Sequence, residues 1–167
     1  EGLDESVYHA TNACGSSMLK NFIDAPAKYQ ASLKGELVFS GDSLDLGSAT
    51  HALVLEPELF NDKFVVMPSE IKRKAGKVWD AFRLANETKT ILSQAQHNKV
   101  LTMQKAVMDT HAQYFTGGKA EVSYFKRHET GAVIKARIDY EIDDLSVDLK
   151  TTKSADPNEW GYSAIKY

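Results

Sequence analysis

The chain has 167 residues, of which 43% are hydrophobic and 26% are charged, and this composition fits one globular domain with a core of its own. Its net charge of −3 gives no global sign of nucleic-acid binding, so DNA would have to be held by a local basic patch. The single cysteine, Cys14, excludes an internal disulfide framework and a four-cysteine zinc or iron–sulfur site. No apolar run is long enough to span a bilayer, and the acidic start is not a secretory signal, so we expect a cytoplasmic protein without a membrane segment.

A helix is predicted over residues 44–55, because its apolar residues recur at helical spacing and Pro57 follows. Gly47 lies four residues before His51 and therefore on the same helix face. A glycine there lets another backbone, or a ligand, come close to the imidazole. By residue type alone a single helical histidine is more often structural than a ligand, so both interpretations of His51 stay open here.

The densest basic run in the chain precedes a second amphipathic helix. It consists of Lys72, Arg73, Lys74 and Lys77. A solvated loop and a DNA-binding patch that contacts phosphates are equally good interpretations of such a run.

A longer helix is predicted from Ser93 to about His111. Ser93 and Gln96 have the spacing of a capping box, in which each side chain satisfies the other residue's backbone N–H. His97 and His111 are too far apart on this helix to form a pair of metal ligands, so we expect both at its surface or boundary.

From Ala120 onward the apolar period changes to two, which predicts a meander of antiparallel strands. Glu129–Thr130–Gly131 fits a three-residue hairpin loop with glycine in the left-handed position. Counting outward from that loop places Glu121 opposite Asp139. A slip of one residue would turn Glu121 to the other face of the sheet.

A second hairpin is predicted around Asp143–Asp144, with Asp139 opposite Asp148. Directly opposed side chains on a sheet have Cβ atoms about 5 Å apart, and like charges there repel. Two facing carboxylates are therefore either a solvated accident or a site for a cation. Lys150 points to the same face as Asp148, so an ordinary exposed ion pair is the alternative interpretation.

These residue types fit metal-dependent phosphodiester hydrolysis. Carboxylates select hard cations, and Mg²⁺ is usually held by one or two acids together with substrate phosphates. Asp139 and Asp148 would supply the acids, and the backbone carbonyl of Leu149 is a candidate further ligand. Lys150 would orient the attacking water or neutralise charge in the transition state.

The pattern Asp139…Asp148-Leu149-Lys150 resembles the core of the PD-(D/E)XK nuclease superfamily. Further motifs occur in the order seen in RecE-type exodeoxyribonucleases, with RecB-like and YqaJ-like nucleases as relatives. These are Tyr8-His9, Leu46–His51, Leu55-Glu56-Pro57, Ala120-Glu121, Thr130-Gly131 and Asp148–Lys153 followed by Ala155. The resemblance covers nearly the whole chain.

The resemblance implies an α/β (α+β) fold with a restriction-endonuclease-like core, a mixed central sheet flanked by helices. It implies that His51 joins Asp139, Asp148 and Leu149 as a metal ligand, that Lys150 is catalytic, and that Glu121 acts near the metal. The implied activity is an Mg²⁺-dependent exonuclease, with Mn²⁺ as a substitute, that degrades linear double-stranded DNA from the 5′ end without ATP. Such enzymes work in recombination or phage DNA processing, as rings and with a single-strand annealing protein.

The family pattern continues beyond the point where this sequence ends, at Tyr167. We therefore expect residues 1–167 to be a single nuclease domain that lacks its C-terminal part. Two other functions remain open: an endonuclease of the same fold on branched or single-stranded DNA, and a non-catalytic DNA-binding or assembly module. Intact Asp139, Asp148 and Lys150 argue against the module, whereas the mildly acidic charge favours it.

Overall fold

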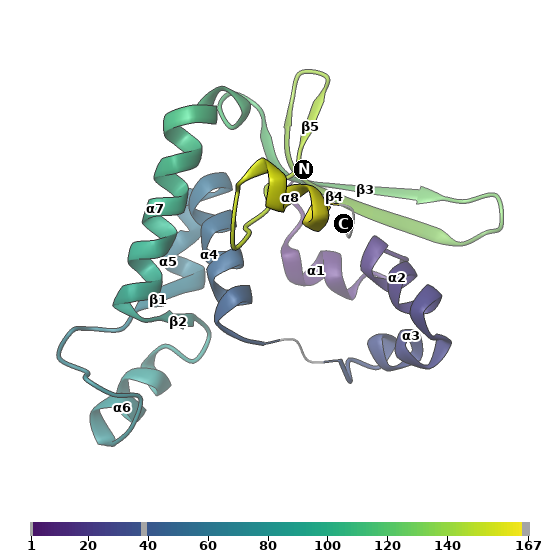
Figure 1. Cartoon of the computed structure of the whole chain (residues 1–167). Coiled ribbons are helices and arrows are strands. Elements are labelled where there is room, and N and C mark those ends of the chain that lie inside the picture. The colour runs from purple at the N-terminus through teal and green to yellow at the C-terminus, as the bar shows by residue number, and fades with distance from the viewer. Residues whose placement is uncertain (1, 38–39, 165–167) are drawn as a thin grey trace.

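The computed structural model describes residues 2–37 and 40–164 and contains both helices and strands (Figure 1). The helices are α1 (Glu5–Ala10), α2 (Ser16–Asp24), α3 (Pro26–Leu33), α4 (Asp42–Leu55), α5 (Phe60–Lys63), α6 (Lys77–Ala85), α7 (Gln94–His111) and α8 (Pro157–Ala164). Short 3-10 turns cover Pro57–Leu59 and Ala112–Tyr114. The strands are β1 (Phe64–Val66), β2 (Thr90–Leu92), β3 (Lys119–Arg127), β4 (Val133–Ile142) and β5 (Leu145–Val147).

The strands are divided between two small sheets. β1 and β2 pair in parallel, whereas β3, β4 and β5 form an antiparallel sheet in that order. The predicted α/β class is therefore confirmed, with its parallel and antiparallel strands in separate sheets. Figure 1 shows α4 and α7 beside the parallel pair and the long β3–β4 hairpin extending away from it.

The predicted register of the first hairpin is confirmed, and that of the second is confirmed from Ile142–Leu145 to Tyr140–Val147. The predicted pair Asp139–Asp148 lies beyond the end of β5. The β3–β4 loop closes with a hydrogen bond from the His128 N–H to the Ala132 carbonyl, and Gly131 has the expected left-handed φ of +86°. In the second hairpin Ile142 pairs with Leu145 across the Asp143–Asp144 turn. These registers fix which side chains of the three strands share a face.

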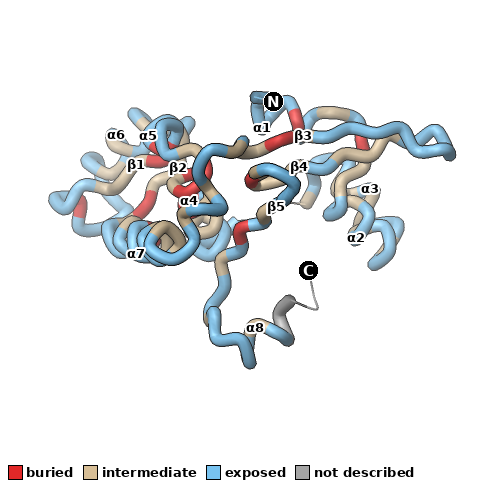
Figure 2. The backbone as a smooth tube through the Cα atoms, turned by 90° about the horizontal axis from the view of Figure 1, so that it is seen from above, coloured by how far each residue is buried: buried red, intermediate tan, exposed pale blue. Residues whose placement is uncertain are grey.

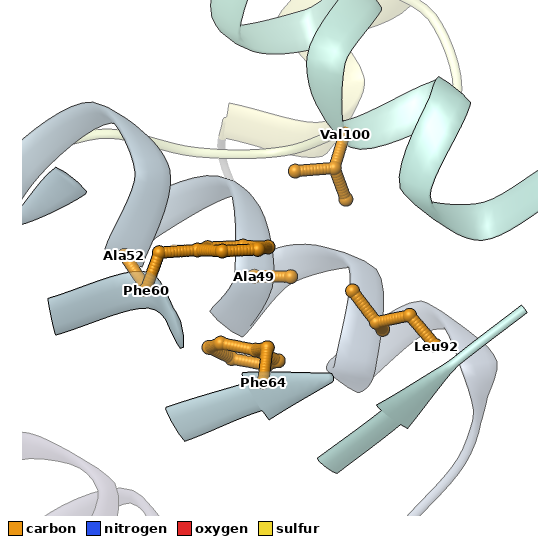
Figure 3. Close-up of a cluster of buried hydrophobic side chains, with 6 residues drawn as sticks. All are labelled: Ala49, Ala52, Phe60, Phe64, Leu92 and Val100. Carbon is orange, nitrogen blue, oxygen red and sulfur yellow. The ribbon is translucent and has the colours of Figure 1, made fainter. Parts of the chain in front are cut away.

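The first core cluster packs α4 and α7 onto the parallel pair (Figure 3). Its buried members are Ala49, Ala52, Phe60, Phe64, Leu92 and Val100. The small side chains of α4 let α7 approach, and Ala49, Leu92 and Val100 have no exposed surface. The N-terminus of α7 carries the predicted capping box between Ser93 and Gln96. This packing fixes the position of α4 against α7 and the parallel pair.

A second core cluster joins the end of α4 to the antiparallel sheet. Val54 and Leu55 of α4 are buried with Tyr140 of β4 and with Leu149, which follows β5. Burying an apolar side chain of this size stabilises a fold by about 1.5–3 kcal/mol. The cluster therefore fixes α4 against the strands that carry the predicted acids.

Exposure is greatest away from these two clusters. Figure 2 shows buried segments around α4, β1 and β2 and at the inner end of the β3–β4 hairpin. α6 projects at the end of the molecule opposite that hairpin, with Val78 70% and Leu84 71% exposed. Among the described residues, no helix is long and apolar enough to cross a membrane.

Candidate metal centre

Three side chains from distant parts of the chain converge beside the second core cluster. His51 on α4, Glu121 on β3 and Asp139 on β4 each offer one ligand atom, and these atoms all lie within 4.8 Å of one another. The His51 Nδ1 atom is 3.7 Å from the Asp139 Oδ2 atom. All three residues are partly buried. We refer to them as the His–Glu–Asp cluster.

Asp139 is held in place by the backbone of the chain that returns beside it. Its Oδ2 atom accepts a hydrogen bond of 2.8 Å from the Leu149 N–H. Since the Leu149 side chain is anchored in the second core cluster, this N–H is a fixed donor. The contact also places the segment from Asp148 to Lys150 next to the cluster.

The backbone of Glu121 is strained. It lies opposite Asp139, between the paired positions Ala120–Tyr140 and Val122–Ile138. Its φ is +52°, a left-handed conformation that costs a residue with a side chain roughly 1–2 kcal/mol. Such strain persists where neighbouring structure imposes it, and it concentrates at functional sites. The flanking pairs impose it here.

Burial raises the pKa of the Glu121 carboxyl above its usual value, and the neighbouring Asp139 adds to the effect. Arg137 opposes the rise, since its Nε donates to the Glu121 carboxylate. The raised pKa therefore reflects first the removal of this carboxyl from water, and then its repulsion by the neighbouring carboxylates of Asp139 and Glu56. A bound cation would offset that repulsion.

The donor set fits a divalent cation. Carboxylate oxygens suit Mg²⁺ and Mn²⁺, and an imidazole is tolerated by several divalent metals. Ligand atoms about 2.1–2.2 Å from one ion and on opposite sides of it are about 4.3 Å apart. Only one pair of the three can lie opposite each other, and adjacent octahedral ligands are about 3 Å apart. The atoms of the cluster, which lie within 4.8 Å of one another, therefore have to move closer together when an ion binds.

Arg137 contacts the cluster through its hydrogen bond to Glu121, and it was not assigned a role from the sequence. Its guanidinium lies 5.3 Å from the ring centre of Tyr8 on α1, and its Nη1 atom is buried with no hydrogen-bond partner among the described residues. The Lys135 Nζ atom also lies over the Tyr8 ring, 4.8 Å from its centre. The sequence signal for this contact was the predicted register, which places Arg137 on the neighbouring strand and diagonal to Glu121, within reach of a long side chain.

Asp148 and Lys150 lie outside the cluster. β5 ends at Val147, and the Asp148 side chain is 66% exposed, with its Oδ1 atom 2.6 Å from the Lys150 Nζ atom. Leu149, between them, is only 8% exposed. The structure thus brings His51, Glu121 and Asp139 together, places Leu149 against Asp139, and pairs Asp148 with Lys150 at the surface.

A cavity of about 290 Å³ opens onto the cluster. His51, Glu121, Glu56, Gly47 and Thr151 are among its lining residues. A Cβ atom added to Gly47 would lie 3.3 Å from the Thr151 Oγ1 atom, so the absent side chain gives the segment after Lys150 room beside α4. Gly47 was expected to admit a backbone or a ligand beside the imidazole; in the structure its neighbour is the Thr151 side-chain hydroxyl.

The predicted DNA-binding run lies elsewhere in the molecule. Lys72, Arg73 and Lys74 are exposed in the loop before α6, and Lys77 is the first residue of that helix. The Lys74 Nζ atom lies 6.0 Å from the Trp79 ring centre. Because α6 projects away from the antiparallel sheet (Figures 1 and 2), the structure does not bring this run to the His–Glu–Asp cluster. Its contact with DNA stays a prediction.

Fold and site together define a mixed α/β domain with a candidate metal centre of the kind expected for the PD-(D/E)XK superfamily. The family model described as "PDDEXK-like domain of unknown function (DUF3799)" matches residues 15–167, so the chain belongs to that family. No curated protein and no solved structure matches the chain. The predicted superfamily is confirmed, and the family membership is compatible with RecE-type nucleases without specifying them.

Proposed function

We propose that the chain is a divalent-metal-dependent deoxyribonuclease that hydrolyses phosphodiester bonds of linear double-stranded DNA from its ends. The observation that carries this proposal is the His–Glu–Asp cluster, which lies beside the Asp148–Lys150 segment in a PDDEXK-like domain. Metal ligands next to a lysine are the parts that phosphodiester hydrolysis requires.

In this proposal His51, Glu121 and Asp139 hold Mg²⁺, for which Mn²⁺ can substitute. The ion supplies Lewis-acid activation of the phosphodiester and of the attacking water. Asp139 also keeps the Leu149 backbone beside the site through its hydrogen bond, which makes the Leu149 carbonyl a further candidate ligand. Lys150 donates to the attacking water or to the charged transition state.

Asp148 has to turn toward the cluster to act as a metal ligand. Its side chain is mostly exposed, and an exposed ion pair such as Asp148–Lys150 contributes only about 0–1 kcal/mol. Rotation of both side chains is therefore inexpensive. A bound metal would attract the Asp148 carboxylate, and the substrate phosphate would attract the Lys150 ammonium group, so both side chains would turn inward.

The finer parts of the proposal come from the resemblance to RecE-type nucleases. They are 5′-to-3′ polarity, independence from ATP, a role in recombination or phage DNA processing, a homo-oligomeric ring and a single-strand annealing protein as partner. Light scattering during size-exclusion chromatography tests the ring directly. End-labelled duplexes test the polarity, since label is released first from the end that is attacked.

The test of the proposed function compares linear and circular duplex DNA incubated with the protein and Mg²⁺. Loss of linear DNA alone is the expected result, and EDTA or the substitution Asp139→Asn should prevent it. Cleavage of circular DNA would show that the protein is an endonuclease and would contradict the proposed exonuclease. Retention of both substrates would contradict a nuclease and favour a non-catalytic DNA-binding module.

A further inference from the structure

A second and larger cavity, of about 900 Å³, lies between α4, α7 and the segment that follows Lys150. It shares Ser43, Leu44 and Thr151 with the cavity at the His–Glu–Asp cluster. The two cavities are therefore neighbours along one surface, joined at Thr151. We refer to the larger one as the α4–α7 groove.

The groove has the chemistry of a phosphate-binding surface. Lys99 of α7 and Lys153 of the returning segment line it, and both residues are exposed. Among the described residues, neither lysine has a carboxylate within ion-pair distance, and no acid is among those that line the groove. In a chain of net charge −3, a cavity with two lysines and no acid is a local reversal of charge.

Neutral donors and apolar surface complete the lining. Ser43, Thr151 and Thr152 contribute hydroxyl groups and Asn98 an amide, and such groups make many of the contacts to phosphate and sugar in nucleic-acid complexes. Leu44, which is half exposed, offers apolar contact for sugars and bases. The groove thus offers donors for a backbone and a surface for the groups attached to it.

The size of the groove restricts its occupant. Ligand sites commonly measure about 300–1,000 Å³, so the groove has room for a short stretch of one strand. A short single strand is the occupant that this volume accommodates, so a duplex end would have to open before one of its strands entered the groove.

We infer that the α4–α7 groove binds one DNA strand and leads it to the His–Glu–Asp cluster, with Lys99 and Lys153 contacting its phosphates. This inference rests on the proposed function for the identity of the strand. It assigns the main DNA contact to the groove rather than to Lys72, Arg73, Lys74 and Lys77.

The two basic surfaces are compared with variants that change the net charge equally. One variant carries Lys99→Ala and Lys153→Ala, and the other carries Lys72→Ala and Lys74→Ala. Binding of a fluorescein-labelled oligothymidylate is measured by fluorescence anisotropy in EDTA, which prevents cleavage, over a range of salt concentrations. Circular dichroism confirms that both variants are folded, and Mg²⁺-dependent cleavage by the unsubstituted protein is measured in parallel.

The groove variant should bind the oligothymidylate roughly tenfold more weakly. The slope of the logarithm of its binding constant against the logarithm of the salt concentration should become less steep by about 1.4, or roughly 0.7 for each lost phosphate contact on a single strand. The Lys72/Lys74 variant should bind like the unsubstituted protein.

Three results would overturn the inference: binding by the groove variant as tight as that of the unsubstituted protein, equal weakening of binding in both variants, or no binding by the unsubstituted protein. If cleavage is present and the groove variant binds normally, the groove assignment fails and the proposed function stands. If cleavage is absent and the groove variant alone loses binding, the groove assignment stands and the proposed function fails.

Discussion

The His–Glu–Asp cluster and the Asp148–Lys150 pair are neighbours in space, but the fold holds them very differently. The cluster is built on α4, β3 and β4, is partly buried, and includes a strained backbone at Glu121 and a fixed hydrogen bond at Asp139. The pair follows the end of β5, and Asp148 is mostly exposed. Leu149 connects the two regions, because its side chain is buried and its N–H binds Asp139.

This difference suggests a division of work within the proposed site. Preorganised ligands bind an ion with little rearrangement, which suits the cluster. Exposed and weakly paired groups rearrange easily, which suits residues that engage only when substrate arrives. If the two regions differ in this way, substitutions in the cluster and in the pair should have different effects on metal binding and on stability.

Substitutions of Asp139 and of Asp148 should have the largest effects on cleavage. Asp139→Asn keeps an oxygen that can accept from the Leu149 N–H but removes the charge at the centre of the cluster. A metal ion contributes several kcal/mol to such reactions, and each 1.36 kcal/mol is tenfold in rate, so cleavage should fall at least about 100-fold. Mg²⁺-dependent cleavage of linear duplex checks this. Retention of activity would remove Asp139 from the site.

Asp148→Ala should abolish cleavage but leave the fold almost unchanged. An exposed ion pair contributes about 0–1 kcal/mol, so the free energy of unfolding should change by no more than about 1 kcal/mol. The adjacent change Leu149→Ala provides the contrast, because truncating a buried leucine costs about 2–5 kcal/mol. Urea unfolding and cleavage assays measure both quantities. An Asp148→Ala protein with full activity would mean that the Asp148–Lys150 pair is only a surface ion pair.

His51→Ala should weaken metal binding more than DNA binding. The loss of one of three protein ligands should raise the Mg²⁺ concentration for half-maximal cleavage by about tenfold, because even supporting partners of metal ligands contribute 10–100-fold. His97→Ala, on α7, is the matched control. An Mg²⁺ titration that is the same for both variants would count against His51 as a ligand.

The smallest expected effect is on the pH dependence of stability in EDTA. The folded chain keeps the Glu121 proton to a higher pH than the unfolded chain, whose pKa is near the ordinary value of 4.5. The folded state therefore binds more protons above that pH, and Glu121 lowers the free energy of unfolding as the pH rises through its raised pKa. Glu121→Gln should remove this decline, whereas Glu129→Gln, in the exposed hairpin loop, should not. Thermal unfolding from acid to neutral pH measures the difference, and parallel curves for all three proteins would contradict it.

Features that depend on local chemistry could be predicted from the sequence. The loops at Glu129–Gly131 and Asp143–Asp144 fixed the two registers, because turn chemistry and the period of two determine which residues face each other. The capping box at Ser93 and Gln96 is equally local. These features placed Glu121 opposite Asp139 correctly.

Features that depend on tertiary packing could not be derived in this way. His51 reaches the sheet because Leu55 of α4 packs with Tyr140 and Leu149, and helix periodicity does not specify that docking. Only the resemblance to RecB-like and RecE-like nucleases indicated His51. The positive φ of Glu121 has no sequence signal, since the residue is not glycine. Counting from the turn put Asp148 across from Asp139, but the strand pairing ends at Tyr140–Val147, and turn chemistry does not tell where β5 ends or where the exposed Asp148 side chain points.

Anomalous diffraction from crystals soaked in Mn²⁺ is the most direct test for a metal ion at the His–Glu–Asp cluster, because it locates the ion without relying on activity. We predict a peak about 2.0–2.4 Å from the His51 imidazole and from the carboxylates of Glu121 and Asp139, and its loss in Asp139→Asn crystals. A saturating Mn²⁺ soak that gives no peak between these three residues, or a peak only elsewhere, would show that they do not form a metal site.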